Sequence, residues 1–139
     1  VSDVNDMSSM KLIDFGLGDK QRINDERCGT YMYMAPEIVN RDNRYTKSVD
    51  IWAIGIIMHQ LICNKHPFYD SKIDDRDTLI EKLKKMRHVE PDKSLSKLAK
   101  NLFERLMAVH LGKRYSAKEA LHHPWITRQL ESDVPMAGY

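Results

Sequence analysis

The hydrophobic positions of this 139-residue chain recur mostly at helical spacing. The most apolar run covers residues 49–63, in which eleven of fifteen side chains are apolar. This run is shorter than the roughly 20 residues of a membrane span, and it is interrupted by Asp50, His59 and Gln60. A helix that is apolar on nearly every side is typical of a protein core. We therefore predict a buried helix over about 46–63.

Further helices are predicted downstream of residues 66–67, because the His-Pro dipeptide there disfavours helix. Apolar residues repeat at helical spacing over 79–86, and more clearly over 95–107. Ser116 and Glu119 form an S-x-x-E pattern ahead of the next apolar pair. Such a pattern is typical of a capping box at a helix start.

The N-terminal part has a different pattern. Residues 10–15 alternate apolar and polar side chains and the alternation breaks at Gly16, which predicts a short strand that ends in a turn. Residues 17–29 are polar without a sustained period, which indicates a loop. Pro36 predicts the first turn of a short helix, and from about residue 128 the chain reads as a polar tail. The pattern therefore predicts a mostly helical domain with one strand pair at its start.

Composition narrows the function classes. A chain that is 42% hydrophobic and 30% charged is an ordinary globular one. A net charge of +2 argues for neither nucleic acid nor an acidic membrane surface as a partner. Cys28 and Cys63 lie far apart, and their spacing gives no support for a zinc site. We expect reduced thiols and a cytoplasmic location. His122 and His123 precede Pro124, and we expect them to cap or pack rather than bind metal.

The first candidate for chemistry is Asp14-Phe15-Gly16, which follows the predicted strand. Asp14 would place a carboxylate at the end of the strand, Phe15 an apolar side chain beside it, and Gly16 a flexible turn. Magnesium prefers such an oxygen ligand beside a substrate phosphate. The triplet alone is weak evidence, because it should occur by chance in about 2% of chains of this length.

The strength of the signal comes from several motifs in one order. The others are GTxxYxAPE over 29–37, Asp50-x-Trp52-x-x-Gly55, Lys113-Arg114 and His123-Pro124-Trp125. In this order and at these distances, they resemble the C-terminal lobe of eukaryotic serine/threonine protein kinases. The run GKRYSAKEALHHPWI over 112–126 is most similar to the calcium/calmodulin-dependent kinase group.

The resemblance implies a fold and an activity. The fold would be mainly α, the C-terminal lobe of the protein kinase-like (α+β) fold with a short β pair at its start. The lobe would cover 1–127, with an activation segment over 14–37 and a tail over 128–139. The activity would be transfer of the ATP γ-phosphate to serine or threonine of protein substrates, with ATP and Mg²⁺ as cofactors.

The resemblance also implies roles for individual residues. Asp14 would hold Mg²⁺ on the ATP phosphates, and Phe15 and Gly16 would complete that part of the nucleotide site. Thr30 would contact the catalytic aspartate and lysine of the complete kinase. The Gly29-Thr30 pair favours serine or threonine as the acceptor, because tyrosine kinases usually carry a proline-containing sequence there.

Five further residues would have structural roles: Glu37, Arg114, Asp50, Trp52 and Gly55. Glu37 and Arg114 would form an ion pair between the Ala-Pro-Glu motif and a later helix. Asp50 would hold the backbone of the catalytic loop. Trp52 and Gly55 are expected to be packing residues.

Parts of a complete kinase are absent from the sequence: the glycine-rich loop, the phosphate-pairing lysine, the helix glutamate and the H-R-D-x-x-x-x-N loop. We therefore expect this chain to be inactive without an N-terminal lobe and a catalytic loop. The alternative is a pseudokinase or scaffold lobe that binds partner proteins, against which the intact Asp14-Phe15-Gly16 argues. Regulation by calcium or calmodulin stays open, because 128–139 shows no basic amphipathic helix.

Overall fold

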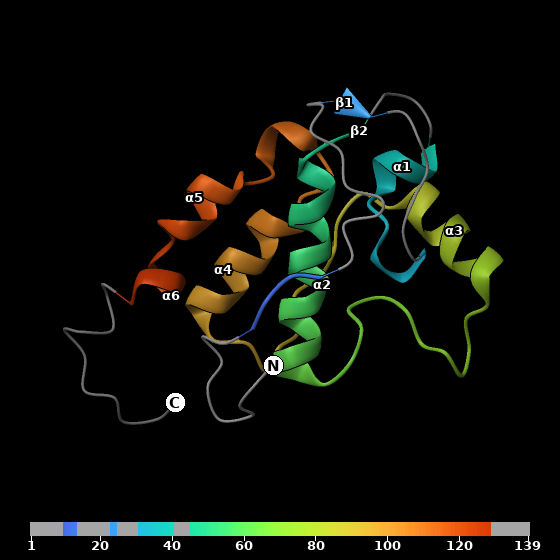
Figure 1. Cartoon of the computed structure of the whole chain (residues 1–139). Coiled ribbons are helices and arrows are strands. Elements are labelled where there is room, and N and C mark those ends of the chain that lie inside the picture. The colour runs from blue at the N-terminus through green and yellow to red at the C-terminus, as the bar shows by residue number, and fades with distance from the viewer. Residues whose placement is uncertain (1–9, 14–22, 25–30, 41–44, 129–139) are drawn as a thin grey trace.

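The computed structural model describes residues 10–13, 23–24, 31–40 and 45–128. This part is mainly α, as predicted (Figure 1). Its helices are α1 (Pro36–Asn40), α2 (Ser48–Cys63), α3 (Arg76–Lys85), α4 (Lys97–Leu106), α5 (Ala117–Leu121) and α6 (Pro124–Thr127), with 3-10 turns η2 (Tyr31–Tyr33) and η3 (Leu111–Lys113). Strands β1 (Ile23–Asn24) and β2 (Tyr45–Thr46) form one antiparallel pair.

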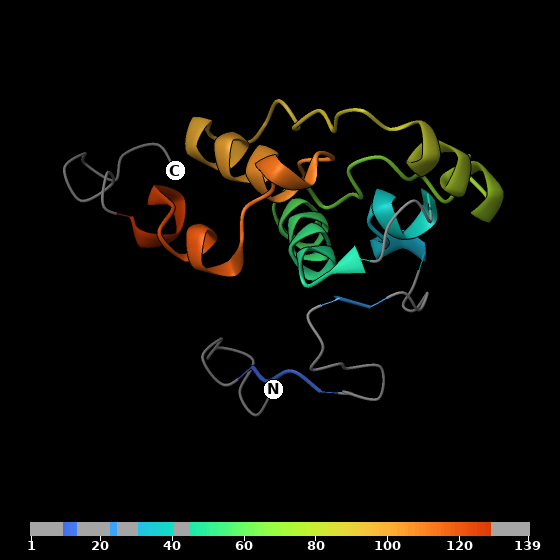
Figure 2. The same cartoon turned by 90° about the horizontal axis from the view of Figure 1, so that it is seen from above.

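Helix α2 is the centre of the fold. It lies between α4 on one side and α1 on the other, with α3 outside α1 (Figures 1 and 2). Trp52 and Ile56 of α2 are completely buried, as is Phe103 of α4. Leu79 and Leu83 of α3 are also buried, which confirms that the apolar repeat over 79–86 is a packed helix. Burial of these side chains contributes roughly 1.5–3 kcal/mol each.

The capping box that the sequence predicts at Ser116 is confirmed, and the C-terminal end of α2 and the N-terminal end of α3 are also capped. Ser116 accepts a hydrogen bond from the backbone of Glu119, and the Glu119 side chain accepts one from the backbone of Ser116. Asp75 caps α3 through its carboxylate. At its C-terminal end, α2 closes on Asn64, which adopts the left-handed conformation with φ of 55° and donates to the Gln60 carbonyl. Asparagine tolerates this conformation better than most residues, so it can end a helix in place of glycine.

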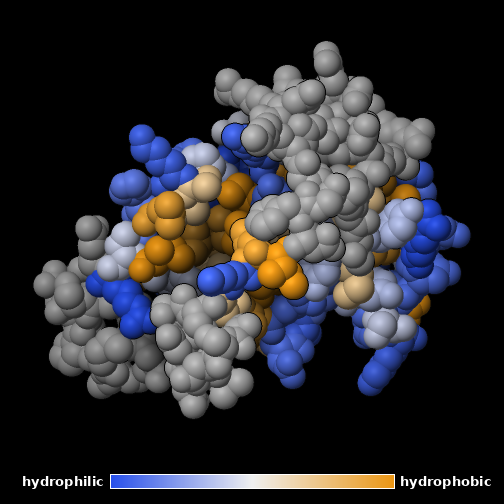
Figure 3. All heavy atoms as spheres, viewed as in Figure 1, coloured by the Kyte–Doolittle hydropathy of each residue, from blue (hydrophilic) through white to orange (hydrophobic). Residues whose placement is uncertain are grey.

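The prediction that α2 is buried on all sides was wrong for one face. Ile54, Ile57, Leu61 and Ile62 are 44–78% exposed. Within the described residues, α2 makes most of its contacts with α4, β2 and η2. The face of the molecule shown in Figure 3 carries an apolar surface near its centre.

The predicted strand at 10–15 was also wrong in its described part. Residues 10–13 have no regular structure, and Leu12 and Ile13 are 83% and 84% exposed. A strand is stabilised by hydrogen bonds to a partner strand, and no described segment pairs with this one. The observed pair lies elsewhere: β1 falls inside the predicted loop over 17–29 and pairs with the distant β2. None of the described helices combines the length and the apolar character of a membrane span.

Candidate functional site

The described site residues surround the first half of α2. They are Glu37 in the first turn of α1, Asp50, Trp52 and Gly55 in α2, and Arg114 directly after η3. The four other predicted site residues, Asp14, Phe15, Gly16 and Thr30, lie outside the described residues. The structure therefore describes the scaffold half of the predicted site.

Glu37 and Arg114 form the ion pair that the sequence predicts across 77 positions. Arg114 Nη1 donates to Glu37 Oε1 at 2.6 Å, and Nη2 donates to Oε2 at 3.1 Å. Two parallel bonds from one planar guanidinium fix the orientation of the carboxylate as well as its distance. The pair thus joins the start of α1 to the segment that leads into α5.

The Arg114 side chain is completely buried, and each of its three nitrogens donates at least one hydrogen bond. Nη1 also donates to the carbonyl of Ser48 at 3.0 Å, and Nε donates to the carbonyl of Ala108 at 2.9 Å. The guanidinium lies over the Trp52 ring, 5.2 Å from its centroid. The Glu37 side chain is only 11% exposed. A buried ion pair is tolerated when further hydrogen bonds satisfy its polar atoms, and this pair meets that condition.

The local sequence explains how Arg114 reaches this position. His110 accepts a hydrogen bond from the backbone of Gly112 and thereby caps the 3-10 turn η3. The backbone of Tyr115 donates to the Arg105 carbonyl at 2.9 Å, which returns the chain to the end of α4. The turn therefore directs the Arg114 side chain inward, although Lys113 beside it is exposed.

Trp52 and Gly55 have the packing roles that the sequence predicts. Trp52 packs against Phe68, with the ring centroids 6.1 Å apart. Its Nε1 is buried and has no hydrogen-bond partner in the described part of the chain. At Gly55, α2 and α4 come so close that an added Cβ would lie 2.5 Å from Met107 Sδ and 3.2 Å from Leu106 Cβ.

Asp50 is exposed in the first turn of α2. A carboxylate is favourable there because the N-terminal end of a helix carries partial positive charge. Its predicted partner, the backbone of a catalytic loop, is not part of this sequence. The role of Asp50 therefore stays a prediction.

Sequence reasoning missed the role of His66, which it treated only as part of a helix-ending dipeptide. Nε2 of His66 lies 2.7 Å from the Met32 carbonyl, and Nδ1 accepts a hydrogen bond from the backbone of Tyr69 at 3.1 Å. Burial lowers the pKa of this histidine, although the bond to Met32 acts in the opposite direction. His66 thus joins the loop after α2 to η2 (Tyr31–Tyr33), directly ahead of α1, and no periodic pattern signals such a contact.

The two histidines before Pro124 have structural roles, as predicted. His123 caps α6 by accepting from the backbone of Trp125, and its other ring nitrogen lies 2.9 Å from Asn101 Oδ1. His122 bonds to the Lys118 carbonyl through Nδ1 at 2.7 Å. The contact with Asn101 joins the start of α6 to α4, and the contact with Lys118 closes the end of α5.

Taken together, the described residues form a rigid support for the segment over 31–37. Ala35 is completely buried and Pro36 begins α1. The Glu37 carboxylate is fixed by Arg114, and the Met32 carbonyl by His66. This segment, which contains η2 and the start of α1, is thereby fixed to the helical core near both of its ends.

Comparisons with known proteins agree with this arrangement. The family model described as "Protein kinase domain" matches residues 2–126. The serine/threonine-protein kinase H1 of Homo sapiens is 37% identical over 133 residues, which cover 90% of this chain and 30% of that protein. The calcium/calmodulin-dependent protein kinase type 1 of Macrobrachium nipponense is 37% identical over 124 residues, which cover 86% and 35%. This chain thus spans about a third of the length of the curated relatives it matches, and it belongs to the protein kinase domain family.

Proposed function

We propose that this chain is the substrate-receiving part of an ATP-dependent serine/threonine protein kinase. The bidentate pair between Glu37 and Arg114 is the observation that carries the proposal. A buried arginine at this distance along the chain serves to hold one carboxylate, and that carboxylate ends the Ala35-Pro36-Glu37 motif. Phosphoryl transfer depends on positioning and charge stabilisation. A fixed surface that receives the substrate segment with the acceptor hydroxyl therefore suits that reaction.

The chain's own contributions to the reaction would come from two residues of the activation segment. Asp14 offers the carboxylate oxygen that Mg²⁺ prefers, and Thr30 offers a hydroxyl for the catalytic loop of a complete kinase. Both lie outside the described residues, so their geometry stays a prediction. The relatives at 37–38% identity are named as serine/threonine-protein kinases, which supports serine and threonine as acceptors here.

The test uses the whole protein with its N-terminal lobe and catalytic loop. The wild type is expected to transfer phosphate from Mg-ATP to a serine- or threonine-containing protein. Asp14→Asn is expected to reduce transfer to background, because magnesium loses its ligand. Asp19→Asn, in the same segment but outside the motif, is the matched control and should keep activity. A wild type without transfer would overturn the proposal in favour of a pseudokinase or scaffold lobe.

The chain of residues 1–139 alone is expected to show no transfer. The general base, the phosphate-pairing lysine and the second metal ligand of kinases do not occur in its sequence. Measurable peptide phosphorylation by the purified chain, with contaminating kinases excluded, would contradict this expectation.

A further inference from the structure

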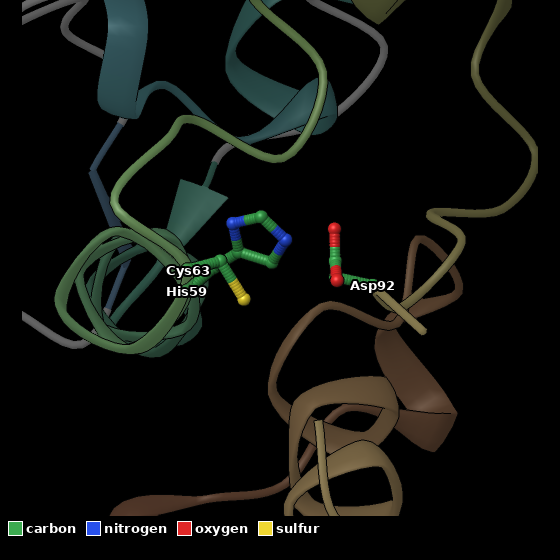
Figure 4. A group of neighbouring side chains, drawn as sticks. All are labelled: His59, Cys63 and Asp92. Atoms are coloured by element: carbon green, nitrogen blue, oxygen red, sulfur yellow. The ribbon is translucent and has the colours of Figure 1, made fainter. Parts of the chain in front are cut away.

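Away from this site, a histidine, a cysteine and an aspartate meet at the C-terminal end of α2. Their potential ligand atoms lie within 4.8 Å of one another. His59 and Cys63 are four residues apart on α2, which places them on one face of the helix. Asp92 approaches from the segment that precedes α4, as Figure 4 shows.

The orientation of His59 leaves one ring nitrogen available. Nδ1 lies 2.8 Å from the backbone carbonyl of Lys65. A carbonyl oxygen can only accept, so Nδ1 carries the proton and the lone pair of the neutral ring is on Nε2. The ring is also packed against Phe103, with the centroids 5.3 Å apart. Figure 4 shows a ring nitrogen turned toward the Asp92 carboxylate. Histidines that bind metals commonly have their other N–H bonded to a carbonyl in this way.

Asp92 and Cys63 complete the set. Asp92 is held by Ser94, whose backbone N–H and hydroxyl both donate to Oδ1, at 2.9 and 2.6 Å. The Cys63 sulfur lies 3.7 Å from the Ser94 hydroxyl and is half-buried. One imidazole nitrogen, one thiol and one carboxylate form a donor set that suits Zn²⁺, which binds nitrogen, sulfur and oxygen ligands in tetrahedral geometry.

We propose that His59 Nε2, Cys63 Sγ and an Asp92 carboxylate oxygen form a binding site for Zn²⁺ or a similar borderline-soft divalent cation, with water in the fourth position. Ligand atoms around a tetrahedral zinc ion are about 3.3–3.6 Å apart, from metal–ligand lengths of about 2.0–2.3 Å. The ligand atoms, which lie within 4.8 Å of one another, therefore need to approach by no more than about 1–1.5 Å when the ion binds. The proton of the Cys63 thiol leaves as the thiolate binds.

Lys65 competes with the ion for Asp92. Its ammonium group lies 2.7 Å from Asp92 Oδ2 in the structure and neutralises the carboxylate there. The Lys65 side chain is 63% exposed, so it can move into water when a cation arrives. An exposed ion pair of this kind contributes little to stability. Removal of Lys65 should therefore increase the affinity for the metal ion. No such increase is expected if His59, Cys63 and Asp92 are only packing neighbours.

The site is tested with Co²⁺, which substitutes for Zn²⁺ and absorbs light. Titration of the 139-residue chain is expected to give d–d bands of tetrahedral Co²⁺ and a thiolate-to-metal charge-transfer band, both removed by Zn²⁺. Cys63→Ser should abolish the charge-transfer band, and Cys28→Ser is the matched control that should keep it. Loss of even an outer partner of a ligand costs about 10–100-fold in affinity. Asp92→Asn should therefore weaken Zn²⁺ binding by at least roughly tenfold, and Lys65→Met should strengthen it.

Alkylation gives a second readout that needs no variant. Zn²⁺ should slow the reaction of iodoacetamide with Cys63 more than with Cys28 in the same molecule, as mass spectrometry would show. Far-ultraviolet circular dichroism checks that each variant is folded. The proposal is overturned if Co²⁺ gives no thiolate band with the wild type, if Cys28→Ser removes that band, or if Zn²⁺ protects Cys28 alone.

Discussion

Arg114 binds the Glu37 carboxylate through two hydrogen bonds while its own side chain has no exposure to solvent. Because the guanidinium also donates to the carbonyls of Ser48 and Ala108, it joins α1, the start of α2 and the segment after α4. Burial of a charged group lowers stability, and burial without a partner of opposite charge lowers it further. The pair therefore determines whether the 31–37 segment keeps its position on the helical core.

Replacement of Arg114 by methionine is expected to lower the free energy of unfolding by about 3–5 kcal/mol, because Glu37 is left charged and nearly buried. Urea unfolding of the chain, followed by circular dichroism, measures this. Lys113→Met is the matched control, since Lys113 is adjacent and exposed, and it should change stability by about 0.5 kcal/mol or less.

The double variant Glu37→Met/Arg114→Met separates the charge effect from packing. Removal of both charges is expected to restore part of the stability lost in Arg114→Met, because no unpaired charge is left. If removal of Glu37 lowered the unfolding free energy as much in the Arg114→Met background as in the wild type, the unpaired Glu37 charge would not explain the instability of Arg114→Met.

Gly55→Ala is expected to destabilise the protein through the α2–α4 contact. The new Cβ would lie 2.5 Å from Met107 Sδ and 2.8 Å from its Cγ, and Met107 is buried. Overpacking of a core costs about 1–3 kcal/mol, whereas alanine gains about 1 kcal/mol over glycine inside a helix. A small net loss of stability follows, measurable by urea unfolding.

The sign of this effect should reverse when Met107 is shortened. In a Met107→Ala background, the two atoms closest to the new Cβ are gone and the looser contact with Leu106 Cβ at 3.2 Å remains, so Gly55→Ala should be neutral or stabilising through helix propensity. Equal destabilisation in both backgrounds would show that Met107 is not the obstacle.

The helices and the ion pair were predictable from the sequence for different reasons. Helical periodicity and the Ser116–Glu119 capping box are local signals, and they identified the helices over 79–86, 95–107 and after 116. The Glu37–Arg114 pair spans 77 positions. No local sequence pattern predicts this pair, and its prediction came only from the resemblance of the motifs to those of protein kinases.

The errors have a common physical origin. Periodicity reports which side chains are apolar, but it does not report what covers them. Thus the pattern predicts Ile57 and Leu61 as core residues of α2, but both are exposed in the described part of the chain. The pattern also predicts a strand that includes Leu12 and Ile13, but no described strand pairs with it. The His66 contact and the His59, Cys63 and Asp92 cluster depend on how distant loops fold back, which a spacing pattern does not contain.

The activation segment is expected to work without phosphorylation between residues 17 and 29, because this stretch contains no serine, threonine or tyrosine. Asp25 or Glu26 could supply a permanent negative charge there. The whole protein, expressed without upstream kinases, should therefore be active on a protein substrate. Activity that appears only after another kinase modifies Thr30 or Tyr31 would contradict this prediction.

The stability of the protein is expected to fall as the pH is lowered through the ordinary histidine range. Burial holds the pKa of His66 below its usual value of 6.5, and burial acts in the same direction on the pKa of His123. Below about pH 6.5 the unfolded chain then binds more protons than the folded one, so the free energy of unfolding decreases with decreasing pH. The positive charge of Lys82 acts in the same direction on the pKa of His66, because it disfavours a second positive charge nearby.

Variants assign this pH dependence to the buried ring. His66→Gln should give a shallower fall in unfolding free energy between pH 7 and pH 5, because the group that takes up the proton on unfolding is gone. His88→Gln is the control, since the His88 side chain is 62% exposed and its only described ion-pair partner is the exposed Glu90. Urea unfolding at a series of pH values measures both slopes. A fall as steep in His66→Gln as in the wild type would show that His66 is not the group that takes up the proton. A shallower fall in His66→Gln, with His88→Gln unchanged, would assign the proton to His66, whose Nδ1 can no longer accept from the backbone of Tyr69 once the ring is protonated.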